Sequence, residues 1–109
     1  MFNKDRTILE FPIEEFNFND GIDVIDELQV GTSVTLVSEP DNPYNPEAVS
    51  IYYGEVKLGY VAPGDGYLFK LLYFGYGSKI EAKISQRNND NLNENYFRVV
   101  VYAIDNRIK

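Results

Sequence analysis

Apolar and polar residues alternate along several stretches of the chain, and Gly or Pro interrupts the pattern between them. Residues 7–13 (TILEFPI) predict a first strand, which Pro12 places at an edge or near its end because proline cannot donate to a ladder. A second strand, rich in β-branched residues, is expected over 31–39. Residues 47–62 predict a hairpin, because alternating segments flank a Gly-X turn at 54–55.

The clearest helical pattern covers residues 63–77, where leucines recur on one face: Leu68, Leu71 and Leu72. Asp65 is the expected N-cap of this helix. Gly75 or Gly77 is expected to end it, because glycine commonly terminates helices. A shorter apolar pattern over 22–28 predicts a brief helix.

Two more strands are expected in the second half, over residues 79–86 and 96–104, and a polar turn over 87–95 separates them. The first of these has period-two alternation. Strands follow strands, with a helix inserted late. This order predicts a mainly β fold, a small OB- or SH3-like antiparallel barrel of five or six strands with one or two short helices. The length of 109 residues favours a single domain over 1–109.

Composition excludes several kinds of site. The chain has no Cys and no His, so it lacks thiolate metal ligands, the commonest general base and the commonest transition-metal ligand. Nothing places two carboxylates in a defined cleft, so we expect no catalytic residues, no metal and no cofactor. No apolar run could span a bilayer and no secretion signal is visible. We therefore expect no membrane association and a cytoplasmic location.

Charge is unevenly distributed along the chain. Residues 1–56 carry two bases and twelve acids, 2 − 12 = −10, and residues 57–109 carry eight bases and five acids, 8 − 5 = +3, giving the net charge of −7. Contacts with a polyanion would therefore depend on the second half. Three basic residues of that half would lie on the same face of the strand expected over 79–86 and its end, and so predict a positive stripe: Lys79, Lys83 and Arg87. This stripe is either a solvated edge or a surface that binds phosphates.

The segment EPDNPYNP (39–46) places a tyrosine between two prolines. Pro43 and Pro46 restrict φ to about −65° and so reduce the entropy lost when the loop orders. A ring held in this way, that of Tyr44, can stack on a nucleic-acid base. Asn side chains also commonly bond their own backbone in turns, so an ordinary turn with Tyr44 capping the barrel is the alternative.

Residues 36–61, LVSEPDNPYNPEAVSIYYGEVKLGYV, resemble the HIRAN domain family, whose core contains E-P-x-N-P-Y-D-x-N-A-V and, further on, L-G-Y-V-P. The flanking FNFNDGIDVIDELQVG and GYLFKLLYFG also resemble the family, so the likeness covers about residues 8–86. It implies an OB-like barrel. HIRAN domains of eukaryotic remodelling ATPases bind single-stranded DNA and capture its free 3′ end, and this chain resembles the small stand-alone bacterial copies.

The resemblance also implies roles for individual residues. Tyr44 would stack on the terminal base, and Phe18 would supply a second ring. Asn42 would lie beside the sugar-phosphate, and Tyr60 on the rim of the pocket. Asn45 stands where the family usually has Asp, so the acceptor for the 3′ hydroxyl would be neutral and weaker. The basic residue that often accompanies the first-strand aromatics has no match here.

The expected function is therefore a non-catalytic module that binds single-stranded DNA, at a 3′ end, with the basic stripe holding phosphates. The alternative is a protein-interaction or assembly module that binds no nucleic acid. A homo-oligomer of this chain is one form that such an assembly could take. The module would use the surplus aromatic residues as a contact surface: Tyr52, Tyr53, Tyr73 and Tyr76.

Overall fold

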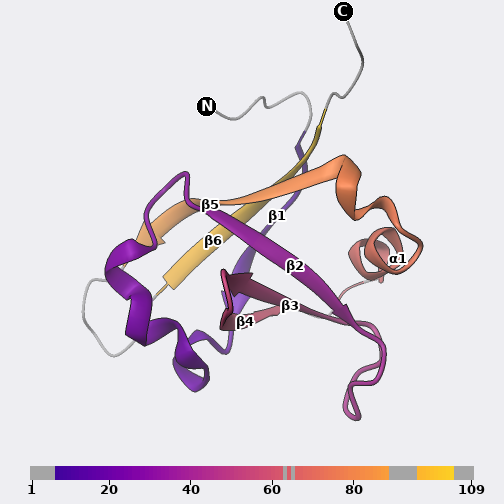
Figure 1. Ribbon diagram of the computed structural model, residues 1–109, viewed down its shortest axis with the longest axis horizontal. Coiled ribbons are helices and arrows are strands. Elements are labelled where there is room, and N and C mark those ends of the chain that lie inside the picture. The colour runs from indigo at the N-terminus through magenta and orange to yellow at the C-terminus, as the bar shows by residue number, and fades with distance from the viewer. Residues whose placement is uncertain (1–6, 63, 65, 89–95, 105–109) are drawn as a thin grey trace, which may run out of the picture.

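The computed structural model describes residues 7–62, 64, 66–88 and 96–104. Six antiparallel strands form a closed barrel in the order β1-β4-β3-β2-β5-β6, and β6 pairs with β1 (Figure 1). The predicted mainly β barrel is confirmed. The strands are β1 (Thr7–Glu14), β2 (Ser33–Glu39), β3 (Ala48–Tyr53), β4 (Val56–Val61), β5 (Ile80–Asn88) and β6 (Tyr96–Ala103).

Inward-facing residues from these strands form one core with residues outside them, such as Leu28. The core includes seven side chains of less than 2% exposure: Phe97, Leu28, Ile51, Leu58, Ile84, Val99 and Val101. The predicted hairpin forms, and Gly54 occupies its turn with φ +60°. Pro12 lies near the end of β1, opposite Arg98 of β6. The alternating pattern therefore assigned the strands to the correct residues.

The helices are shorter than the sequence predicts. Helix α1 covers Tyr67–Tyr73, and its N-cap is Gly66 rather than Asp65, which lies outside the described residues. Gly66 at φ +80° begins the helix, and Gly75 at φ +93° follows its end, as predicted. Both positions are left-handed, and glycine adopts that region without strain.

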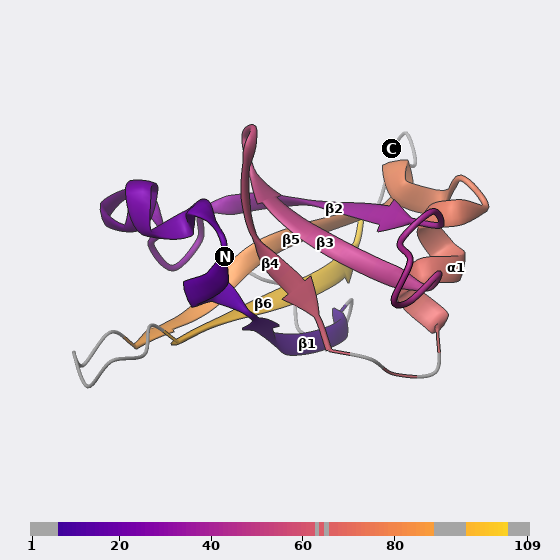
Figure 2. The same cartoon turned by 90° about the horizontal axis from the view of Figure 1, so that it is seen from below.

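Three 3₁₀ segments complete the described part of the fold: η2 (Phe16–Phe18), η3 (Asp20–Glu27) and η4 (Tyr76–Lys79). The predicted helix over 22–28 is part of η3 and is interrupted at Val24, whose φ/ψ are not helical. Figures 1 and 2 both show η3 at one end of the molecule and α1 at the other. The loop between β2 and β3 lies at the α1 end in both views.

The predicted positive stripe along β5 is wrong. Lys79 lies in η4, before the strand begins. The β5–β6 register shifts between Ile84 and Gln86, so that Arg87 lies opposite the fully buried Phe97. An extra residue in one strand reverses the side-chain parity beyond it, which places Arg87 on a different face from Lys83. Residues 89–95 of the predicted polar turn lie outside the described residues.

Candidate nucleic-acid interface

The loop between β2 and β3 is shaped by the side chain of Asn42. Its Oδ1 accepts hydrogen bonds from the backbone N–H groups of Tyr44 at 2.8 Å and Asn45 at 3.1 Å. Its Nδ2 donates to Oε1 of Glu39 at 3.0 Å. Asn42 thus satisfies the two backbone N–H groups that follow Pro43 and determines the position from which the Tyr44 side chain projects.

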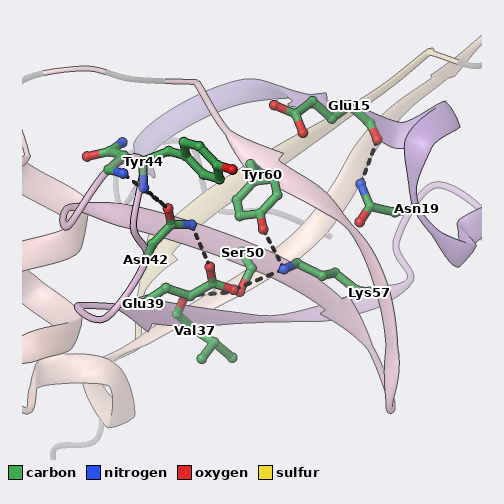
Figure 3. Close-up of polar contacts among 10 residues, drawn as sticks. Glu15, Asn19, Val37, Glu39, Asn42, Tyr44, Ser50, Lys57 and Tyr60 are labelled. Carbon is green, nitrogen blue, oxygen red and sulfur yellow. Dashed lines mark hydrogen bonds and ion pairs between the residues drawn. The ribbon is translucent and has the colours of Figure 1, made fainter.

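Glu39 is in turn held by Lys57, whose Nζ lies 3.1 Å from Glu39 Oε2. Lys57 also donates to the Tyr60 hydroxyl at 2.5 Å. Ser50, which is fully buried, lies opposite Tyr60 in the β3–β4 ladder. A continuous polar network therefore runs from β4 through the end of β2 to the loop (Figure 3).

A bulge makes this network possible. Lys57 and Tyr60 are three residues apart, a spacing that points side chains to opposite faces of a regular strand. The β3–β4 register shifts between Ile51 and Tyr52, so both side chains lie on the outer face while Leu58 stays buried. Gly59 accommodates the bulge at φ +154°, where an added Cβ would lie 2.2 Å from the Glu14 carbonyl oxygen.

The network also affects ionisation. Burial raises the pKa of Glu39, but the hydrogen bonds it makes with Asn42, Ser50 and Lys57 outweigh that effect and lower the pKa below its ordinary 4.5. Burial lowers the pKa of Lys57, but its bonds to Tyr60 and Glu39 raise it above 10.5. The pair is therefore charged at neutral pH, and Glu39 keeps its acceptor role toward Asn42.

Tyr44 projects from this fixed loop into solvent, with 95% of its side chain exposed. The alternative in which Tyr44 caps the barrel is therefore excluded. The ring stands over an open groove of about 520 Å³ lined by eight residues: Ser38, Glu39, Pro40, Asp41, Asn42, Pro43, Tyr44 and Tyr60. The groove thus unites three of the predicted site residues.

Phe18 projects from a second fixed turn. The Glu15 carbonyl accepts hydrogen bonds from the backbone N–H of Phe18 at 3.0 Å and from Asn19 Nδ2 at 2.7 Å. Phe16 anchors the turn, because it is buried and packs on Phe97 with ring centroids 4.9 Å apart. The ring of Phe18 is 86% exposed.

Figure 3 shows Tyr60 between Tyr44 on one side and the Glu15–Asn19 turn on the other. Glu14, which precedes that turn, pairs directly with Tyr60. The Phe18 turn is outside the groove lining, and the end of β1 that leads into it adjoins β4, the strand that carries Tyr60.

The profile of the HIRAN domain family matches residues 9–103. The chain belongs to the HIRAN domain family. Its fold resembles that of a structural genomics target from Lactobacillus plantarum, with TM-score 0.75, 19% identity and coverage of 90% of this chain and 93% of that one. It also resembles the HIRAN domain of human HLTF, with TM-score 0.57, 14% identity and coverage of 94% and 84%. Among curated proteins, none matched.

The remaining predicted residues of this HIRAN domain do not line the groove. Asn45 lines a neighbouring pocket between β1 and α1, and its Oδ1 accepts from the Glu47 N–H at 2.9 Å. Lys83 lies in β5 opposite Ser33. Arg87 Nη1 donates to the carbonyls of Ile25, at 2.8 Å, and Leu28, and its guanidinium lies 5.5 Å from the centre of the Phe97 ring.

Sequence reasoning missed the ion pair between Glu39 and Lys57 that supports the site. Glu39 opens the quoted E-P-x-N-P-Y motif, so that motif contained a signal for it. Lys57 is 18 residues away, and only the strand register and the bulge bring the two side chains together.

No helix among the described residues is long and apolar enough to span a membrane. Within that same part of the chain, His, Cys, Asp and Glu side chains form no group of three suited to hold a metal ion.

Proposed function

We propose that this HIRAN domain binds single-stranded DNA at an end without catalysing a reaction, and that the ring of Tyr44 stacks on the terminal base. The observation that carries the proposal is the 95% exposure of Tyr44 on a loop fixed by its own hydrogen bonds. Stacking on a pre-ordered ring contributes about 1–3 kcal/mol per base and tolerates any base. HIRAN domains are DNA-binding modules, which supports the same class of ligand.

The groove suggests different roles for the predicted residues. Asn42 positions Tyr44, because its amide already bonds Glu39 and the loop backbone. Tyr60 forms the rim, and Phe18 provides a second platform for a base farther along the strand. Asn45 is the acceptor proposed for a 3′ hydroxyl.

We propose a phosphate contact for Lys79, which is exposed on η4. The phosphate contacts expected of Lys83 and Arg87 stay predictions. The side chain of Arg87 is already engaged by backbone carbonyls within the protein.

Fluorescence anisotropy with short single-stranded oligonucleotides tests the proposal. A free 3′ hydroxyl should bind more tightly than a 3′-phosphorylated end, and Tyr44→Ala should lower the affinity about 5- to 150-fold, the range expected for one stacked base. Tyr44→Phe keeps the ring and serves as the matched control. Equal binding by wild type and Tyr44→Ala at low salt would refute the stacking role, and equal binding of both ends would refute end recognition.

A protein-interaction module is the second candidate, and the exposure of Tyr73 and Tyr76, 56% and 54%, favours it. The other two tyrosines of that prediction, Tyr52 and Tyr53, are only partly exposed in β3, and the Tyr53 hydroxyl donates to Glu27 at 2.8 Å. Light scattering distinguishes the two functions, because a stable oligomer that does not bind oligonucleotides would support the protein-interaction module.

A further inference from the structure

The solvent-facing side of α1 carries aromatic and basic residues. Tyr67, Lys70 and Phe74 recur at i, i+3 and i+7, so they share one face of the helix. Leu68 on the opposite face is buried. Tyr73 lies edge-on against Phe74 with ring centroids 5.4 Å apart, and the two rings are 56% and 69% exposed.

Segment η4 continues this surface with Tyr76 and Lys79, both exposed. From Gly66 to Ile80 the sequence contains no Asp or Glu, although the net charge of the protein is −7. The ion pairs found among the described residues, Lys57–Glu39 and Arg98–Glu10, involve neither Lys70 nor Lys79. The α1–η4 surface is therefore defined by six residues: Tyr67, Lys70, Tyr73, Phe74, Tyr76 and Lys79.

The groove under Tyr44 lacks what this surface provides. Its lining includes Glu39 and Asp41 but no Lys or Arg. Lys57, which lies beside it, is already paired with Glu39. Neutralisation of phosphates by Lys and Arg supplies much of the affinity of a protein for nucleic acid. The groove can thus hold a base, while the phosphates that follow need cations elsewhere.

The α1–η4 surface adjoins the groove. Figures 1 and 2 both show α1 next to the loop that carries Tyr44. Asn45 of that loop and Tyr67 of α1 line one pocket of about 240 Å³. The Glu47 carboxylate lies so close to Gly66 that an added Cβ would be 2.7 Å from its Oε1. A strand that leaves the groove on this side therefore meets the start of α1.

We propose that the α1–η4 surface is a second binding site for the same single strand, on which Lys70 and Lys79 bind phosphates and the exposed rings stack on bases beyond the terminal nucleotide. This inference rests on the proposed function. OB folds bind about 4–16 nucleotides, which is more than the Tyr44 groove alone holds.

Anisotropy titrations with oligonucleotides of about 3 and about 12 nucleotides, at several salt concentrations, test the site. The double variant Lys70→Gln, Lys79→Gln should bind the 12-mer about tenfold more weakly at low salt and bind the 3-mer as wild type does. Its log–log salt slope for the 12-mer should be smaller by about 1.4, since each phosphate contact to a single strand contributes about 0.7. Phe74→Ser should weaken 12-mer binding alone, by about fivefold or more.

The matched control is Val30→Asp with Gln86→Glu, two exposed positions at the η3 end that change the net charge by the same amount. Exposed charges farther away than about 8–10 Å are largely screened at physiological salt, so this control should keep the wild-type slope. If the lysine variant loses no more than the control does, the second site is refuted, while 3-mer binding still supports the groove. If wild type binds neither oligonucleotide, both proposals fail. If the lysine variant alters only the oligomeric state, the surface binds protein instead.

Discussion

Asn42 donates its side-chain N–H to Glu39 while its side-chain oxygen accepts the backbone N–H of Tyr44. One amide therefore connects the charged end of β2 to the residue that projects the exposed ring. The loop is ordered by this amide as well as by its prolines. The contribution of Asn42 to stability can be measured separately from the contribution of Tyr44 to binding, because Tyr44 is almost fully exposed.

Asn42→Ala should lower the free energy of unfolding by about 1.5–4.5 kcal/mol, because three hydrogen bonds are lost and each contributes about 0.5–1.5 kcal/mol net. It should also weaken DNA binding, since the Tyr44 loop loses its order. Urea unfolding and anisotropy measure the two effects. Asn45→Ala removes one bond, to Glu47, and should cost less than Asn42→Ala. A stability loss in Asn45→Ala that equals or exceeds that of Asn42→Ala would contradict this account.

Glu39→Gln should show a pH-dependent effect on stability. The pKa of Glu39 is lower in the folded protein than its ordinary 4.5, so the unfolded chain binds the proton more readily. The ionised carboxylate therefore stabilises the fold at pH values above the ordinary 4.5. This contribution to the free energy of unfolding is lost as the pH falls through the lower pKa of the folded protein. The difference in unfolding free energy between wild type and variant should be largest near neutral pH and shrink by about pH 3.

Urea unfolding of both proteins across that pH range measures the difference. Glu55→Gln, in the exposed hairpin turn, corrects for the loss of one negative charge. A difference between wild type and Glu39→Gln that stays constant down to about pH 3 would show that the network does not depend on the charge.

Gly59→Ala should destabilise the barrel by more than about 3 kcal/mol, because strain at a left-handed position adds to a backbone clash. The new Cβ would lie 2.2 Å from the Glu14 carbonyl oxygen, at the short β1–β4 ladder that helps to close the barrel. Gly64→Ala is the matched control, since nothing lies within 4 Å of its Cβ position. Thermal or urea unfolding measures both, and equal stabilities would refute the role assigned to Gly59.

The fold could be predicted from the sequence because alternation identifies strands directly, and all six strands lie close to their predicted ranges. The sequence left Tyr44 open between an exposed ring on a proline-stiffened loop and a ring that caps the barrel, and the structure shows the exposed ring. Asn42 was open to two interpretations, a ligand contact or a bond to its own backbone. The structure shows the second.

Bulges account for much of what could not be predicted. An extra residue in a strand leaves no clear mark on its composition, yet it reverses every side chain that follows. The bulge near Gly59 brings Lys57 and Tyr60 to one face, where simple alternation would separate them. The bulge near Ser85 moves Arg87 away from the face of Lys83.

Arg87 provides the sharpest test of that second bulge. Its guanidinium donates to the carbonyls of Ile25 and Leu28 and lies on the Phe97 ring, so it connects η3 and the residue after it to the barrel. Arg87→Gln should lower the free energy of unfolding by about 2 kcal/mol, the range for bonds made by a charged group. The salt slope of DNA binding should not change, because the charge is engaged inside the protein.

Arg87→Lys distinguishes this role from a phosphate contact. Lysine keeps the positive charge but cannot reproduce the planar fork of donors, so the variant should lose stability while keeping any attraction to phosphate. Urea unfolding and salt-dependent anisotropy on both variants measure the two quantities. If Arg87→Gln is as stable as wild type and its slope falls by about 0.7, the phosphate contact is supported and the structural role is refuted.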